Sequence, residues 1–425
     1  MTAPNVNNFA RKLGPGLITG AADDDPSGIA TYSQAGSQFR FGLVWTLLLT
    51  TPLMIGIQML SARIGWVTGE GLGVNIARMC PRWLTMTLVG LLVVANTINI
   101  AADIGAMGEA VRLLAGGPQA SYIVGFGVLS ILGQVCFSYE RTVRILKWLT
   151  MALFSYVAVI LTVSIPWRQA GVEALTPWAH FPAGVSANEY ASMVVAVLGT
   201  TISPYLFFWQ ASQEVEDGRR RPEAARLRDH PEYVAEHLWR IKLDTYIGMG
   251  LSNLIAVCIV IATAVTLNLH GITNIQTSSQ AAEALRPVAG EFAFTVFALG
   301  IVGTGLLAVP VLAGSAAYAV SDVFGWKGSL SHGFHEARGF YAIIIVATVV
   351  GTLMSTLEVD PLKALVWSAI VNGVIAVPIM VVMMWIGQST RIMGSLTISP
   401  RHRFFGWAAT GVMGLAVAFM AVTSV

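Results

Sequence analysis

Charged side chains are scarce in this sequence. Asp, Glu, Lys and Arg make up only 11% of its 425 residues, whereas 55% of the residues are hydrophobic. Soluble proteins carry about 25% charged residues. A chain with so few charges cannot coat a water-exposed surface of this size. This excludes an ordinary soluble protein and predicts an integral membrane protein.

Several other features are missing. The three cysteines, Cys80, Cys136 and Cys258, lie far apart, which excludes a disulfide framework and a CxxC metal site. No GxxxxGK motif followed by Ser or Thr is present, so direct use of ATP is not expected. The first 16 residues lack a continuous apolar core before Arg11 and Lys12, and we expect no cleavable signal peptide. We also expect no enzymatic activity, no permanently bound cofactor and no nucleic-acid partner.

Long apolar runs dominate the sequence instead. A helix needs about 20 apolar residues to cross a hydrocarbon core of about 30 Å. Eleven such runs are present, and we expect helices because lipid offers the backbone no hydrogen-bond partners. The predicted spans cover residues 13–39, 42–62, 84–111, 120–138, 145–166, 188–213, 243–267, 291–320, 339–357, 363–386 and 404–424.

The distribution of lysine and arginine predicts the topology. If the amino terminus lies in the cytoplasm, twenty of the 25 Lys and Arg residues fall on the inner side, as the positive-inside rule requires. The carboxyl terminus is then outside, and we expect the bacterial inner membrane as the location. The charged insert at 214–242 falls on the inner side. Its basic run is typical of a cytoplasmic loop, with contact to anionic lipid headgroups as the alternative.

The predicted spans 13–39 and 188–213 each contain a proline near the middle, beside polar or small residues. Pro26 follows three aspartates, and Pro204 follows small and hydroxyl residues. A proline removes one helical hydrogen bond and clashes with the preceding turn. Either proline alone would indicate only a kink, but interrupted segments at corresponding places of two halves indicate a transporter binding site. The chain is expected to form one transmembrane domain (1–425) with two repeats and an additional helix, at 1–166, 188–386 and 404–424.

The aspartates beside the first break point to a cation. An ionised carboxylate at mid-bilayer costs at least ~2.5–3.5 kcal/mol, so such groups mark ion or proton pathways. Asp25 lies at the break and is the predicted ligand, joined by the carbonyl oxygens that the breaks free at Ala22 and Thr200. Asp23 and Asp24 either face a water-filled approach or cap nearby backbone amides.

These segments resemble a known family. The stretches "GPGLITGAADDDPSGIATYSQAGSQF" (14–39), "GTTISPYLFFWQAS" (199–212) and "GTGLLAVPVLAGSAAYAVSDVFGW" (303–326) are similar to the Nramp divalent-metal transporters, and the similarity covers almost the whole chain. The resemblance implies an all-α LeuT-type fold with eleven transmembrane helices, a 5+5 inverted repeat with helices 1 and 6 interrupted, and alternating access. It implies a divalent cation as substrate, the bilayer and protons as further partners, and a functional monomer.

The first metal-site motif of the family is altered. It reads Asp-Pro-Gly-Asn, and the same positions hold Asp25, Pro26, Ser27 and Gly28. The aspartate ligand is kept and the asparagine ligand is lost. Mg²⁺ commonly keeps several waters around one or two carboxylates, and the small Gly28 would leave room for them.

The second motif is altered more strongly. The family's Met-Pro-His becomes Ser203, Pro204 and Tyr205. Losing the soft thioether favours hard cations, so we expect Mg²⁺ or Mn²⁺, partly hydrated. The predicted ligands are then oxygen atoms of Asp25, Ala22, Thr200 and Ser203. The expected cavity lining is Asp24, Pro26, Gly28, Pro204, Tyr205 and Asn372.

The family's proton route is only partly kept. Its Asp-Leu-Ala-Glu stretch aligns with Asp103 but lacks the glutamate, and Glu109 is a candidate substitute one turn beyond the missing position. Arg338 aligns loosely with a basic residue near the proton exit. Ile370 replaces the glutamine of the tenth span, with Asn372 nearby. Since the histidine and glutamate are missing, we expect weaker proton coupling than in typical members.

Two alternatives stay open. The same fold carries small organic solutes in sister families, where half-helix amino termini hold an anionic group, and the aromatic residues around Tyr205 would suit such a solute. Asp25 argues against an anionic substrate. A sensor or a channel-like pore is the third class, but two symmetric breaks favour alternating access.

Overall fold

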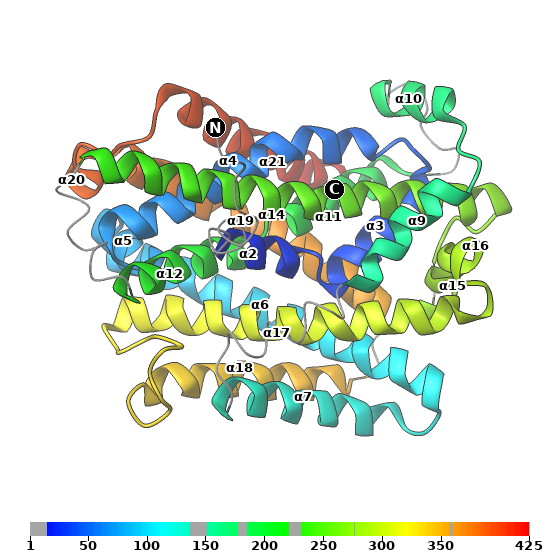
Figure 1. Ribbon diagram of the computed structural model, residues 1–425, viewed down its shortest axis with the longest axis horizontal. Coiled ribbons are helices and arrows are strands. Elements are labelled where there is room, and N and C mark those ends of the chain that lie inside the picture. Colours follow the sequence, from blue (N-terminus) through cyan, green and yellow to red (C-terminus); the bar gives the residue numbers. More distant parts are fainter. Residues whose placement is uncertain are drawn as a thin grey trace, which may run out of the picture.

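The computed structural model describes residues 15–136, 151–176, 185–220, 231–275, 277–357 and 360–424, and all regular structure in these ranges is helical. Most of the long helices run along the longest axis of the molecule (Figure 1). Several predicted positions lie outside the described residues: the basic pair Arg11 and Lys12, the span ends at 137–138 and 145–150, and the middle of the insert at 221–230.

Eight continuous helices are long and apolar enough to cross a membrane in the described part of the chain. They are α4 (Val44–Thr68), α6 (Arg82–Ala115), α7 (Gln119–Cys136), α14 (Pro231–Thr266), α17 (Ala293–Phe324), α18 (Arg338–Ser355), α19 (Pro361–Gln388) and α21 (Pro400–Thr423). Short helices connect them: α5 (Leu72–Met79), α15 (Ser278–Ala282), α16 (Arg286–Ala289), α20 (Thr390–Met393) and the single turns η1 (Met151–Leu153), η3 (Asn268–His270), η4 (Glu283–Leu285) and η5 (Gly290–Phe292).

The remaining predicted spans are interrupted or bent. A ninth crossing segment joins α11 (Ala187–Thr201) to α12 (Pro204–Arg220), and a tenth consists of η1 with α9 (Phe154–Thr162) and α10 (Trp167–Leu175), bent by 114°. The pair α2 (Pro15–Asp23) and α3 (Pro26–Phe39) corresponds to the first predicted span. Its helices have 9 and 14 residues, so each is too short to cross alone. The all-helical membrane architecture is thus confirmed, while the bend before α10 was not predicted.

Both predicted interruptions are present. In each case the proline begins the second helix, since α3 starts at Pro26 and α12 starts at Pro204. A proline is tolerated there because its missing N–H would have no helical partner anyway. The breaks at 24–25 and 202–203 therefore leave backbone groups free inside the bundle.

Glycines hold the broken segments against their neighbours. A Cβ on Gly20 of α2 would lie 2.3 Å from the backbone of Gly248 in α14. A Cβ on Gly199 of α11 would lie 2.1 Å from the Ala369 carbonyl oxygen in α19. No side chain fits at either contact, so α2 packs directly on α14 and α11 packs directly on α19. These contacts hold the two helices that precede the breaks against their neighbours.

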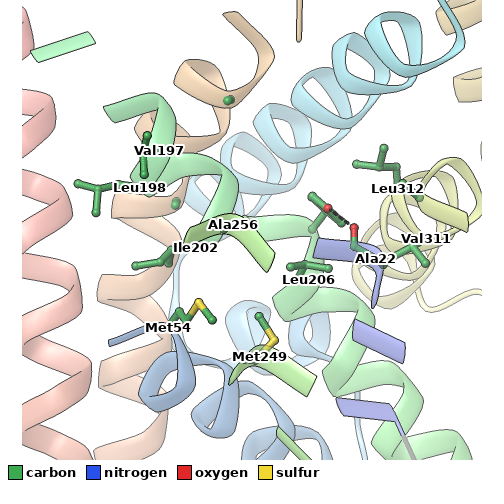
Figure 2. Close-up of a cluster of buried hydrophobic side chains, with 14 of the residues drawn as sticks. Ala22, Met54, Val197, Leu198, Ile202, Leu206, Met249, Ala256, Val311 and Leu312 are labelled. Atoms are coloured by element: carbon green, nitrogen blue, oxygen red, sulfur yellow. Dashed lines mark hydrogen bonds between the residues drawn. The ribbon is translucent and has the colours of Figure 1, made fainter. Parts of the chain in front are cut away.

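Apolar side chains enclose the breaks. Figure 2 shows Ala22 close to Val311 and Leu312 of α17, with Leu206 of α12 nearby. Figure 2 also shows Ile202, from the second break, below Leu198 of α11. All of these residues are buried. Any polar group at the breaks is therefore cut off from bulk water by packed hydrocarbon.

Candidate metal centre

Asp25 occupies the first break and uses one of its oxygens as a helix cap. Its Oδ1 accepts hydrogen bonds from the Gly28 amide (2.7 Å) and the Ser27 hydroxyl (2.8 Å), and the residue is the N-cap of α3. The sequence leaves capping open as a role for Asp23 and Asp24. The structure assigns capping to Asp25 instead, because the proline after it starts the new helix.

The second oxygen of Asp25 points toward two other helices. Its Oδ2 lies 3.2 Å from the Asn99 amide nitrogen of α6 and 3.4 Å from the Tyr205 hydroxyl of α12. Asp25 is only 1% exposed. One carboxylate oxygen thus caps α3. The other faces the place where the two breaks meet α6.

The Tyr205 hydroxyl connects the two breaks. It also lies 3.1 Å from the carbonyl oxygen of Ala22, in the last turn of α2. A phenol has one proton, so it donates either to Ala22 or to Asp25 at any moment. Two of the predicted cation ligands therefore lie within reach of a single point, which the phenolic oxygen now occupies.

The other two predicted ligands lie in the second break. The Ser203 hydroxyl donates back to the carbonyl oxygen of Gly199 (2.7 Å) or Thr200 (3.0 Å), which leaves its lone pairs free. A Cβ on Gly28 would lie 3.2 Å from the Thr200 hydroxyl oxygen, so α3 touches the second break at this residue. Hence the predicted residues from both spans gather in one region.

Asp23 and Asp24 lie elsewhere than expected. The Ser252 hydroxyl of α14 lies 2.7 Å from Asp23 Oδ2 and 3.0 Å from Asp24 Oδ1. Gly20 of α2 contacts Gly248 of α14. Both aspartates lie about one turn beyond Gly20, and Ser252 lies one turn beyond Gly248, so the same helix contact brings the aspartates beside Ser252. Both aspartates are buried. The water-filled approach and the cavity-lining position expected for Asp24 are therefore replaced by a contact with α14.

Helix α6 supplies Asn99, which sequence analysis did not single out, together with the predicted Asp103. Asn99 is buried, and its Oδ1 makes no hydrogen bond to the described residues. Asp103 lies one turn further along α6. Both of its carboxylate oxygens are buried and make no hydrogen bond to the described residues. Asn372 of α19 likewise has both amide atoms unpaired. The sequence did contain a signal for a polar role of Asn99, because an amide is costly inside an apolar span. The same signal applies to Asn96, so it could not distinguish the two residues.

The remaining predicted route residues are not brought together with Asp103. Glu109 accepts a hydrogen bond from Ser278 of α15 (2.9 Å). Arg338 is exposed at the start of α18, whereas Ser355 at the other end of α18 donates to the Ala101 carbonyl oxygen of α6 (2.6 Å). Arg338 is thus about 25 Å along the helix from the level of Ala101.

A cavity with mixed polar and apolar walls lies on the side that the topology predicts to be outside. It measures about 410 Å³ and is lined by side chains of α3, α11 and α19 together with the segment after α14. Four of its polar side chains are neutral amides, and Glu189 and Lys363 are the charged ones. Ile370 lies two residues from the buried Asn372. Its lining includes Gln34, Gln38, Asn188, Asn274, Lys363 and Ile370.

The donor set at the breaks is unusual for a tightly held metal. Within the described residues, no group of three or more His, Cys, Asp and Glu side chains could hold a metal ion. A cation at the breaks would rely on one carboxylate with neutral oxygens and water. Such a set consists of the oxygen ligands that hard cations prefer.

Interrupted helices that meet at a buried carboxylate define a transporter of LeuT-type fold. The sequence profile of the family described as Natural resistance-associated macrophage protein-like (Nramp) matches residues 16–423. The chain belongs to the Nramp family.

Curated relatives are similar over nearly the full length. The divalent metal cation transporter MntH of Klebsiella pneumoniae subsp. pneumoniae is 25% identical over 430 residues, covering 97% of this chain and 96% of the relative. MntH of Acidiphilium cryptum is 25% identical over 405 residues, covering 91% and 84%. These relatives are transporters, in agreement with the membrane-protein architecture.

Solved structures share the fold. The Eremococcus coleocola manganese transporter, in complex with an aromatic bis-isothiourea compound, has a TM-score of 0.76 at 16% identity, covering 100% of this chain and 88% of that one. Mhp1, a nucleobase-cation-symport-1 family transporter, has a TM-score of 0.53 at 14% identity, covering 97% and 93%. At these identities the likeness defines the architecture alone.

Proposed function

We propose that this chain carries a hard divalent cation, Mg²⁺ or Mn²⁺, across the membrane by alternating access. The observation that carries the proposal is Asp25, a buried carboxylate with one oxygen directed at the junction of two interrupted helices. The MntH relatives are divalent metal cation transporters by name, which supports the same substrate class.

The proposed ligands are oxygen atoms from three helices. Asp25 Oδ2 and the Ala22 carbonyl oxygen come from the first span, and the Thr200 carbonyl and Ser203 hydroxyl oxygens come from the second. We add the Oδ1 atom of Asn99, which is buried and unpaired while its amide nitrogen bonds Asp25. The cation would displace the Tyr205 hydroxyl from between Ala22 and Asp25.

Asn99 compensates for the carboxamide that the family has at the position of Gly28. A Cβ on Gly28 would lie 3.2 Å from the Thr200 hydroxyl oxygen and 3.3 Å from both the Asp23 carbonyl oxygen and the Tyr32 ring. These distances are tighter than ordinary contacts, so an asparagine at this position would force its neighbours apart. The amide oxygen comes from α6 instead.

The cation reaches the site partly hydrated. The neutral amides of the outer cavity, among them Gln34 and Asn274, can exchange hydrogen bonds with hydration water without trapping the ion as a ring of carboxylates would. Pro26 and Pro204 keep the breaks open, and Asn372 offers unpaired amide atoms below Ile370.

Proton coupling is proposed to be weak. Asp103 is retained and buried, but Glu109 is bonded to Ser278 and Arg338 is distant along α18. The remaining expectations follow the sequence: the two repeats rock against each other, the amino terminus is cytoplasmic, the carboxyl terminus is outside, and a monomer in a bacterial inner membrane is sufficient.

The test is cation flux into proteoliposomes, with Mg²⁺ and Mn²⁺ measured side by side for the wild type and Asp25→Ala. Flux of either ion that the substitution abolishes supports the proposal, and the ratio of the two rates measures selectivity. No flux of either ion through folded protein would overturn it and direct attention to small organic solutes.

A further inference from the structure

A second cavity lies at the opposite end of the bundle, between α4, α14 and the start of α21. It measures about 240 Å³. Three basic side chains line it, Arg63, Lys242 and His402, and no acidic residue does. The other walls are apolar and consist of Met59, Leu60, Leu238, Trp239, Ile241 and Ile398. This composition suits an anion that carries hydrocarbon.

The positive charges in this cavity are not neutralised by carboxylates. The Arg63 guanidinium donates to the carbonyl oxygens of Leu396 (3.0 Å) and Thr397 (2.9 Å), which hold it in place without cancelling its charge. The Lys242 ammonium lies 5.6 Å from the centre of the Tyr246 ring. Neither Arg63 nor Lys242 takes part in the ion pairs formed by the described residues.

Helix α21 adds to the positive potential. His402 lies in its first turn, three residues after the N-cap Ser399. That turn contains no acidic residue, so no side chain of the turn offsets the positive end of the helix dipole. The amino terminus of α21 thus reinforces the basic side chains at the cavity.

The cavity lies near the end of α4 that the topology predicts to be cytoplasmic. Arg63 is five residues before the end of α4, which corresponds to about 7.5 Å along the helix. Trp239, on the cavity wall, is 53% exposed, and Phe405, one turn beyond His402, is 37% exposed. Exposed aromatic side chains beside basic ones are typical of the membrane–water interface.

We propose that this cavity binds the phosphate of an anionic phospholipid from the leaflet predicted to face the cytoplasm. A cavity of about 240 Å³ suits a headgroup phosphate but not a whole lipid. The acyl chains would lie outside, along Trp239 and its apolar neighbours. Basic pockets between transmembrane helices on the cytoplasmic side recognise such headgroups. The proposal is independent of the metal centre.

The test titrates lipids into the purified full-length protein in detergent, with binding followed by native mass spectrometry and by the thermal unfolding midpoint. The probes are phosphatidylglycerol, phosphatidylcholine with the same chains, and inorganic phosphate. The variants are Lys242→Gln and Lys242→Gln with His402→Gln, which leave the structural bonds of Arg63 intact. Lys327→Gln is the matched control, because Lys327 is exposed and outside the cavity.

We expect phosphatidylglycerol to bind and to raise the unfolding midpoint more than phosphatidylcholine. Loss of the Lys242 charge should weaken this binding about fivefold, and Lys327→Gln should leave it unchanged. Equal binding of both lipids, or equal loss in the control, would overturn the proposal. Inorganic phosphate that competes at millimolar concentration and alone raises the midpoint equally would show a soluble-anion pocket and also overturn it. If the double variant does not fold, Lys242→Gln decides alone.

Discussion

The amide nitrogen of Asn99 lies 3.2 Å from the Oδ2 atom of Asp25, and the oxygen of the same amide is buried without a partner. This contact links α6 to the break in the first span. It also puts a carboxamide beside the retained aspartate, although the family's asparagine position is a glycine here.

Replacing Asn99 by alanine should weaken cation binding. Hydrogen bonds and ligand contacts to charged groups are worth about 1.5–3 kcal/mol, so we expect Mg²⁺ affinity to fall about tenfold to a hundredfold. Asn96→Ala is the control, since Asn96 is buried one turn earlier and bonds Leu312 and Ser315 of α17. The control should lower stability and keep the affinity. Equal affinity losses would show that Asn99 acts only through packing.

Removing the Tyr205 hydroxyl should strengthen cation binding. The hydroxyl occupies the space between Ala22 and Asp25, and a cation must displace it. Tyr205→Phe removes a hydrogen bond worth about 0.5–1.5 kcal/mol, so affinity should rise roughly twofold to tenfold in a calorimetric titration. A fall in affinity would mean that the phenolic oxygen itself remains a ligand.

Restoring the family's thioether should change selectivity. Ser203→Met puts a soft ligand at the second break, and soft ligands disfavour Mg²⁺ relative to Mn²⁺. We expect the ratio of Mn²⁺ to Mg²⁺ flux to rise, while Ser203→Ala leaves the ratio near that of the wild type. An unchanged ratio in Ser203→Met would place residue 203 outside the coordination sphere.

The glycine contact between α2 and α14 predicts a local difference in stability. A Cβ on Gly248 would lie 2.2 Å from the Gly16 carbonyl oxygen, whereas a Cβ on Gly250 meets nothing within 4 Å. Gly248→Ala should therefore destabilise the protein by about 1–3 kcal/mol through overpacking. Gly250→Ala should be neutral or slightly stabilising, because alanine favours the helix. Thermal unfolding in detergent compares them, and similar midpoints would contradict the packing argument.

The spans and their two breaks were predictable from the sequence because they depend on local properties. Apolar length defines a span, and a proline beside carboxylates or small residues marks a candidate break. A proline alone is not enough, because α4 continues through Pro52. The resemblance of the residues around Asp25 and Ser203 to a family pattern located the candidate site.

The contacts between helices were not predictable in the same way. Whether Asn96 or Asn99 reaches Asp25 depends on how α6 is rotated, and a single span carries no signal for that rotation. The positions of Asp23 and Asp24 beside Ser252 depend on the glycine contact between helices more than 200 residues apart. The 114° bend lies in the short break between α9 and α10, which ends at Pro166. A proline near the end of a span is equally compatible with the span simply ending there, so the sequence did not predict the bend.

The central claim is that the Asp25 carboxylate holds the cation, and calorimetric binding of Mg²⁺ and Mn²⁺ to wild type and Asp25→Asn tests it most directly. Asparagine caps a helix about as well as aspartate, so the substitution removes the charge and keeps α3 intact. We predict binding of both ions to the wild type and no detectable binding to Asp25→Asn, with nearly the same unfolding midpoint. Unchanged affinity in Asp25→Asn would contradict the account.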